Sequence, residues 1–269
     1  DWQQKERIGQ TSLTTPQNKD HYQWSLFAKL DDDRTLDVID RTSQVGLHYS
    51  RKLERTSVSY NLDYYHSRLD EFRSRAWVLS VDWSKHNVDS NSYPRQGYAI
   101  DASIGVASKA MGSSASFVRS YGRYRHFFPF LKKDSLMLRA ELGMVNTRGD
   151  WFDIPSSLLF KAGGSNSIRG YGYQSIGDPE AMKEINVVFP ARFMATASAE
   201  YTHWFNNSWG WAVFYDVGSV TDDLKSRPLY HGVGVGARWR SPVGPIQFDI
   251  AYGYPRKRIA PHISIGIMF

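Results

Sequence analysis

The chain of 269 residues contains no cysteine, which excludes disulfide bonds and thiolate metal ligands. It also lacks any run of eighteen or more apolar residues, and this excludes a transmembrane helix. Its first residues, DWQQKERIGQ, do not resemble a signal peptide. We therefore expect either a mature form or a fragment without its upstream part.

Signs of catalysis and of nucleic-acid binding are missing too. There is no G-x-S-x-G elbow, and the eight histidines are far apart, without metal-ligand spacing. The 33 Lys and Arg against 27 Asp and Glu give a net charge of +6, but the basic residues are scattered rather than clustered. The sequence predicts no enzyme, no metal, no cofactor and no nucleic-acid partner. A barrel hydrolase of the phospholipase type stays open, although nothing marks a catalytic triad.

What the chain does contain is aromatic side chains, 14 % of all residues, in segments that alternate apolar and polar residues. In the first such segment Tyr22, Trp24 and Leu26 alternate with Gln23 and Ser25. A period of two is typical of a β-strand with two different faces. Twelve segments show this alternation, which is least regular in 116–128. The segments are 22–30, 45–50, 58–64, 77–83, 98–106, 116–128, 136–142, 193–201, 211–218, 233–239, 246–252 and 262–269.

The two faces of these segments favour a membrane barrel over a soluble β-sandwich. Trp and Tyr gather near the ends of the apolar faces, as in membrane girdles. The opposite faces carry Arg, Glu and Asp in mid-strand, as in a wet lumen. The sequence therefore predicts an all-β, transmembrane antiparallel up-and-down β-barrel of about twelve strands in the bacterial outer membrane.

The connections between the segments also alternate in character. Short turns such as 205–207 and 241–244 suit the periplasmic side, and polar links at 32–41, 66–73, 151–189, 221–230 and 255–261 suit the outer side. Residues 1–20 alternate poorly, so we expect an N-terminal leader or a partial strand there. The barrel domain is then 21–269.

The longest link contains the sequence GGSNSIRGYGYQSIG at 163–177. Its core Ile168-Arg169-Gly170-Tyr171, here named the IRGY tip, resembles the loop signature of the BamA/TamA superfamily, and most closely that of TamA. These outer-membrane barrels insert or translocate other proteins. The resemblance covers most of 21–269 and is strongest from residue 134 onward.

The resemblance implies that the link 151–189 folds back into the lumen, where Arg169 meets acidic residues of the inner wall. Glu200 in SAEY and Asp216 in FYDVGS match the family's partner positions. Independently, the period-two phase turns both acids away from lipid, on adjacent strands. An arginine offers carboxylates a planar fork that lysine cannot reproduce.

The other residues of the IRGY tip suit a sharp loop. Gly170 tolerates a positive φ, Tyr171 packs beside it, and Ile168 wedges the other side. We predict that the four residues lock the loop in the lumen; the alternative is an ordinary exposed Arg-Gly turn.

Four glycines on two later segments line the predicted inner wall: Gly218, Gly232, Gly234 and Gly236. Three of them are spaced by two and no helix follows, so they are not a dinucleotide-binding fingerprint. We expect them to form a smooth surface against which a loop packs closely.

The chain ends in HISIGIMF, with Ile265, Gly266, Ile267 and the terminal Phe269. This ending resembles the signal that the assembly machinery reads on outer-membrane barrels. The alternative is simply a last strand that ends in an aromatic residue.

Together these features predict the barrel of a TamA-like insertase or translocase that assists assembly or secretion of outer-membrane proteins. The resemblance implies a seam between first and last strands that opens to unpaired N–H and C=O groups, where a substrate strand adds by β-augmentation. Expected partners are the lipid bilayer, unfolded outer-membrane or autotransporter proteins, and a periplasm-spanning partner bound through upstream domains.

Two departures from the family are evident. Its barrels have sixteen strands and carry periplasmic domains before the barrel, whereas we expect twelve strands here, or thirteen at most, and no such domains in this sequence. The chain is then either a C-terminal portion or a shortened relative. Two other functions stay open: a small pore or the secretion-anchor barrel of a passenger-fusion protein, and a purely structural membrane protein.

Overall fold

The protein forms one sheet of thirteen strands, each antiparallel to its neighbours and paired in chain order. The computed structural model describes residues 4–35, 38–131, 133–179, 188–242 and 244–266. The strands are β1 (Gln4–Thr14), β2 (Tyr22–Thr35), β3 (Val38–Lys52), β4 (Thr56–Leu69), β5 (Phe72–Val88), β6 (Gly97–Ala107), β7 (Phe117–Phe130), β8 (Asp134–Thr147), β9 (Phe193–Trp204), β10 (Trp209–Thr221), β11 (Tyr230–Ser241), β12 (Gly244–Tyr254) and β13 (Arg258–Ile265).

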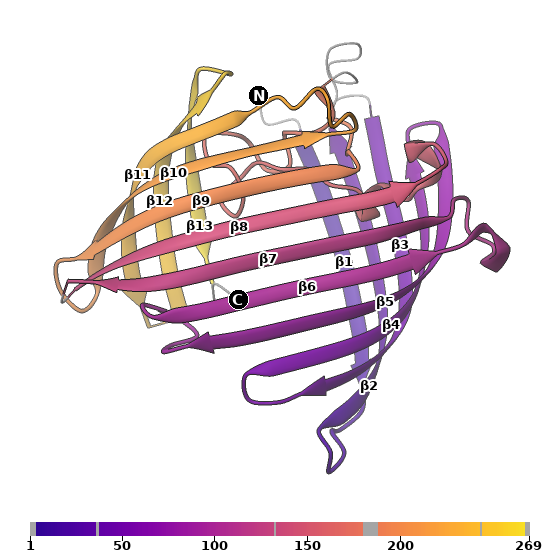
Figure 1. The fold of residues 1–269 in the computed structure, drawn as a ribbon, viewed down its shortest axis with the longest axis horizontal. Helices are drawn as coiled ribbons and strands as arrows, with labels where there is room; N and C mark the ends of the chain where they lie inside the picture. Colours follow the sequence, from indigo (N-terminus) through magenta and orange to yellow (C-terminus); the bar gives the residue numbers. More distant parts are fainter. Residues whose placement is uncertain (1–3, 36–37, 132, 180–187, 243, 267–269) are drawn as a thin grey trace.

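The sheet curves into a barrel wall (Figure 1). Strands β5 to β9 cross the front of the view, while β1–β3 and β12–β13 lie behind them. Within the described residues no ladder joins β1 to β13, so both are edge strands. The residues that the structure describes also contain three short 3₁₀ turns: η1 (Lys109–Met111), η2 (Trp151–Asp153) and η3 (Ser156–Leu158). Over the same residues, none of the helical segments has the length and apolar character that crossing a membrane requires.

The all-β, antiparallel up-and-down architecture is confirmed, and each of the twelve predicted segments overlaps a strand, although 262–269 is described only as far as Gly266. Of the twelve or at most thirteen strands expected, thirteen are found in the described residues. The additional strand is β1, in the region expected to be a leader or a partial strand, and it pairs with β2 from Gln4↔Thr35 to Thr14↔Ser25. Its side chains alternate poorly, but a ladder is made by backbone N–H and C=O groups, which every residue of β1 has.

Two of the polar links predicted for the outer side are shorter than expected. Strand β2 runs to Thr35 and β3 begins at Val38, and β4 ends at Leu69 two residues before β5 begins at Phe72. The strands thus continue through most of 32–41 and 66–73. Where a strand extends beyond the apolar band, both of its faces meet water. The alternation then disappears although the ladder continues.

The two faces of the wall differ in kind. Large apolar side chains such as Leu26, Val235 and Ile263 are exposed on the outside, and charged side chains such as Glu141 and Arg238 are buried inside. This is the distribution of a membrane barrel, with lipid outside and a polar interior. The buried core lies in the lumen, where the long β8–β9 connection packs against the wall.

Candidate functional site in the lumen

The β8–β9 connection, residues 148–192, is named the lumen loop below, and the structure describes it except at 180–187. Its two ends are held together by an antiparallel bridge between Phe160 and Ala191, and Ala162 pairs in the same way with Ile176. These two bridges fix a long excursion whose IRGY tip reaches the inner wall of β9–β13. Ile168 and Tyr171 of the tip are almost wholly buried.

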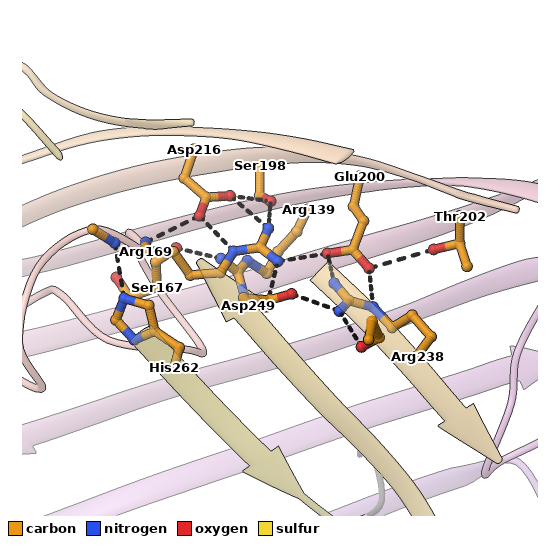
Figure 2. A network of polar contacts seen from close by, with 12 residues as sticks. Arg139, Ser167, Arg169, Ser198, Glu200, Thr202, Asp216, Arg238, Asp249 and His262 are labelled. Carbon is orange, nitrogen blue, oxygen red and sulfur yellow. Dashed lines mark hydrogen bonds and ion pairs between the residues drawn. The ribbon is translucent and has the colours of Figure 1, made fainter. Parts of the chain in front are cut away.

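Arg169 lies between acidic residues of three strands (Figure 2). Its Nε donates to Oδ2 of Asp216 on β10 at 2.8 Å, and Nη2 donates to Oδ1 of the same carboxylate at 3.0 Å. Its Nη1 donates to Oε2 of Glu200 on β9 at 2.6 Å and to Oδ2 of Asp249 on β12 at 3.2 Å. The backbone N–H of Arg169 also donates to Asp216, at 3.0 Å. Arg169 and the two acids expected from the sequence therefore lie together.

The surroundings of Arg169 are dry and negatively charged. Only 3 % of the residue is exposed, and Asp216 is wholly buried. The guanidinium carbon lies 3.3 Å from the centroid of the Phe214 ring, a cation–π contact. Burial by itself would lower the pKa of Arg169, but the hydrogen bond to Asp216 and the charges of Glu200, Asp216 and Asp249 raise that pKa above its ordinary value. The guanidinium stays charged.

A second arginine completes the cluster. Nε of Arg238, on β11, donates to Oε1 of Glu200 at 3.0 Å, and Nη1 donates to Oδ1 of Asp249 at 2.5 Å. Ser198 donates to Asp216 at 2.5 Å. Glu200 and Asp249 each bind both arginines, so two cations and three carboxylates form one connected network across β9, β10, β11 and β12 (Figure 2).

The rest of the IRGY tip contacts β12 and the β12–β13 hairpin. Gly170 has a φ of 90°, and a Cβ atom there would lie 2.6 Å from the backbone nitrogen of Gly253. Two glycine backbones therefore touch directly at this point. The Tyr171 hydroxyl donates to the carbonyl oxygen of Tyr254 at 2.5 Å. Burial raises the pKa of Tyr171 to about 12, so this donor keeps its proton.

The four predicted inner-wall glycines have different neighbours. A Cβ atom at Gly232 would overlap the carbonyl oxygen of Arg169, and one at Gly218 would lie 2.9 Å from Cδ1 of Ile168. Gly234 instead faces the Phe214 ring, and Gly236 faces the carboxylate of Asp249. Two of the glycines thus lie against the lumen loop, and two make room for wall side chains of the network.

The lumen loop has a second attachment on the opposite part of the wall. Ser156, in η3, donates to Oδ1 of Asp40 on β3 at 2.5 Å, and its hydroxyl is 3.0 Å from that of Ser67 on β4. Lys161 lies 3.5 Å from the same aspartate. The loop therefore spans the lumen from β3–β4 to β9–β12.

The predicted C-terminal signal is described only in part. Ile265 is the last residue of β13 and is exposed, and the N–H of Gly266 donates to the carbonyl oxygen of Pro245 at 3.1 Å. Ile267 and Phe269 lie outside the described residues. The assembly signal stays a prediction. In the described ranges, no group of three or more His, Cys, Asp or Glu side chains is placed to hold a metal ion.

Sequence reasoning missed several residues of this site. Asp249, Arg238 and His262 all fall on the polar phase of their segments, which turns them toward the lumen. The phase gives the face but not the height along the barrel, so it could not show that they meet Arg169. Gly253 carried no signal because its partner Gly170 lies on a loop without periodicity, and Ser156 carried none because it belongs to that loop itself.

Comparison with known proteins decides the family. The model of the Omp85 superfamily domain matches residues 4–269, almost the whole chain. The chain belongs to the Omp85 superfamily. The expected membership of the BamA/TamA group of outer-membrane barrels is thereby confirmed, and the chain is a bacterial outer-membrane β-barrel. Its closeness to TamA in particular stays a prediction.

Two curated relatives are outer membrane protein assembly factors BamA. The one from Neisseria meningitidis serogroup B is 25 % identical over an alignment of 220 residues, and the match covers 68 % of this chain and 27 % of that protein. The one from Nitratidesulfovibrio vulgaris is 28 % identical over an alignment of 186 residues, and the match covers 66 % of this chain and 23 % of that protein. The chain thus spans about a quarter of the length of these relatives.

Two solved structures share the fold. BamA from Haemophilus ducreyi lacking POTRA domains 1–3 superposes with a TM-score of 0.79 at 19 % identity, over 96 % of this chain and 61 % of that one. CdiB from Acinetobacter baumannii superposes with a TM-score of 0.63 at 18 % identity, over 98 % of this chain and 50 % of that one. At these identities the likeness concerns the fold alone.

Proposed function

We propose that this Omp85 barrel is the membrane part of a TamA-like insertase or translocase that assists assembly or secretion of outer-membrane proteins. The observation that supports it best is the clasp of Arg169 by Asp216, Glu200 and Asp249 inside the wall. The clasp holds the lumen loop against the strands next to the edge strand β13. The name of the two BamA relatives, outer membrane protein assembly factor, points the same way.

The physical role of the clasp follows from its geometry. An edge strand offers unpaired N–H and C=O groups to which an incoming strand adds. The IRGY tip contacts β12 and the β12–β13 hairpin, so it can keep this edge in a defined position while a substrate strand pairs. Unfolded outer-membrane or autotransporter proteins are the proposed substrates. A periplasm-spanning partner bound through upstream domains is a further part of the proposal.

The test is insertion of an unfolded outer-membrane barrel into liposomes that contain the full-length protein. Folding of the substrate is followed by its heat-modifiable migration on gels. We expect Arg169→Ala to lower the insertion rate strongly and Arg169→Lys to restore it poorly, since an ammonium group cannot form the bidentate contact. The matched control is Arg41→Ala, which removes a largely exposed pair with Asp32. An Arg169→Ala protein that inserts substrate as fast as the control contradicts the proposal.

A small pore, or the anchor barrel of a passenger-fusion protein, is the competing function. The lumen loop, attached at β3–β4 and at β9–β12, favours a barrel that conducts poorly. Planar-bilayer recordings separate the two. We expect low conductance from the wild type and a rise on Arg169→Ala, which frees the loop. A large, steady conductance in the wild type favours the pore.

A further inference from the structure

The IRGY tip contacts the edge strand β13 through one backbone amide. The N–H of Gly170 donates to Nε2 of His262 at 2.9 Å, and His262 is 9 % exposed. His262 is on β13, paired in register with Asp249 of β12. This hydrogen bond therefore leads from the residue after Arg169 to a strand that does not itself contact the guanidinium (Figure 2).

Two consecutive amides of the tip thus have acceptors on different strands. The N–H of Arg169 donates to Asp216 on β10, and the N–H of Gly170 donates to His262 on β13. A buried backbone N–H without a partner is costly, so the loop loses free energy if either acceptor moves away. The dipeptide Arg169-Gly170 therefore connects β10 to β13 through two backbone hydrogen bonds.

The hydrogen bond requires that Nε2 of His262 act as an acceptor. Nε2 of an imidazole accepts only when its proton is on Nδ1 and the ring is neutral. The charged groups that face His262 are Asp249 on β12, Asp216 on β10 and Arg169 of the loop. The approach itself depends on glycine, because a Cβ atom at Gly170 would also lie 2.9 Å from Cα of Gly253. The tip backbone lies flat on β12 and so comes within reach of β13.

We propose that His262 is a positioning residue that couples the lumen loop to the edge strand β13. With the loop in place, the Gly170–His262 bond holds β13 beside β12. When Arg169 leaves its carboxylates, Gly170 moves with it and β13 loses this restraint. The importance of the coupling for substrate insertion rests on the function proposed above, but the coupling can be measured without any substrate.

The experiment compares His262→Leu with His262→Gln in the full-length protein. Leucine has an apolar side chain without a hydrogen-bond acceptor. Glutamine has an acceptor, because its Oε1 lies close to the position of the histidine Nε2. Hydrogen exchange of the β13 amides is measured by mass spectrometry in lipid nanodiscs. From the net weight of one neutral hydrogen bond we expect exchange about fivefold faster in His262→Leu, and within about twofold of wild type in His262→Gln. His48→Leu, which removes a histidine that binds Asp63 at 3.0 Å on β3–β4, should leave β13 unchanged.

A second background tests whether the effect passes through the loop. In Arg169→Ala the tip is already released, so adding His262→Leu should not accelerate β13 exchange further, as expected for two residues of one network. The coupling is refuted by wild-type exchange in His262→Leu, by equal damage from leucine and glutamine, or by a full additional effect in the Arg169→Ala background. Because no substrate is present, these results stand whether or not the protein inserts other barrels.

Discussion

A guanidinium carries five N–H donors in one plane, and each of those of Arg169 has an acceptor on the wall. Lysine has three donors around a point charge and cannot make the two parallel bonds to Asp216. The same site could not be assembled with a neutral residue either, because Asp216 would lose its ion pair with Arg169, and Glu200 and Asp249 would keep only their pairs with Arg238. The arginine is required for its shape as much as for its charge.

Removing this side chain should destabilise the protein. A buried ion pair that loses one partner costs about 3–5 kcal/mol, so we expect Arg169→Ala to lower the free energy of unfolding by an amount in that range. The free energy of unfolding of Arg169→Lys should lie between those of the wild type and of Arg169→Ala. The measurement is the temperature at which the folded band disappears when samples are heated to a series of temperatures before the gel is run. If that temperature does not change, Arg169 does not stabilise the folded protein.

Gly232 offers a second test at single-residue scale, because a Cβ atom there would overlap the carbonyl oxygen of Arg169. We expect Gly232→Ala to displace the IRGY tip and to expose the lumen loop to proteases. Gly122→Ala is the matched control: it also lies within a strand, β7, and a Cβ atom there meets nothing within 4 Å. Similar cleavage of the two variants would show that the close approach at Gly232 has no consequence.

Among the elements, the lumen loop has a defined path because it is attached to the wall at several places, for example where Nε of Arg119 on β7 donates to the carbonyl oxygen of Leu158 at 2.9 Å. Another of these contacts, Ser156 with Asp40 and Ser67, lies on β3–β4. A buried hydroxyl network that loses one member leaves polar groups unpaired, at about 1–3 kcal/mol. The contribution of this contact to stability is therefore comparable with that of one of the ion pairs of Arg169.

We expect Ser156→Ala to loosen this end of the loop while the IRGY tip stays bound. Limited proteolysis should then cut near residues 150–160 several-fold faster, with cleavage near 163–177 unchanged. Ser157→Ala is the control, because the neighbouring side chain is exposed. Faster cleavage at both places would instead mean that the two attachments open together.

The elements show what could be predicted from the sequence and what could not. Alternation located twelve strands, because lipid on one side and a polar lumen on the other select different residues at every second position. It failed for β1, whose segment QKERIGQTSLT is polar on both faces, and for the outer ends of β2 to β5. In the site, phase and resemblance together singled out Arg169, Glu200 and Asp216. Contacts made by the path of the loop, such as Ser156 with Asp40, have no pattern along the chain.

For the whole molecule, every other interpretation depends on which face of the barrel wall meets lipid and which face meets the lumen. Trp211 on β10 is exposed on the outer face, whereas Trp204 on β9 points inward, where its ring stacks on Arg240 at 3.8 Å. The two lie at nearly the same height, since Trp204 pairs with Gly210 and His203 with Trp211. They form a matched pair for testing which face meets lipid.

The chain has nine tryptophans. Variants in which Trp204 or Trp211 is the single tryptophan left, the other eight being replaced by phenylalanine, should respond differently to lipids with brominated acyl chains. We expect bromine to quench the fluorescence of Trp211 strongly and that of Trp204 weakly, because only the outer face contacts acyl chains. Non-brominated lipid of the same length is the reference. Equal quenching of both residues would reverse the assignment of the faces.

The network around Arg169 has one more consequence. Asp216, Glu200, Arg238 and Asp249 come from four successive strands, and their charged atoms converge on one point only at a particular radius of curvature. If the cylinder widens, the carboxylates separate and the hydrogen bonds to the guanidinium lengthen together. The lumen loop therefore limits the diameter of this half of the barrel, and any movement that widens the wall must first displace the arginine.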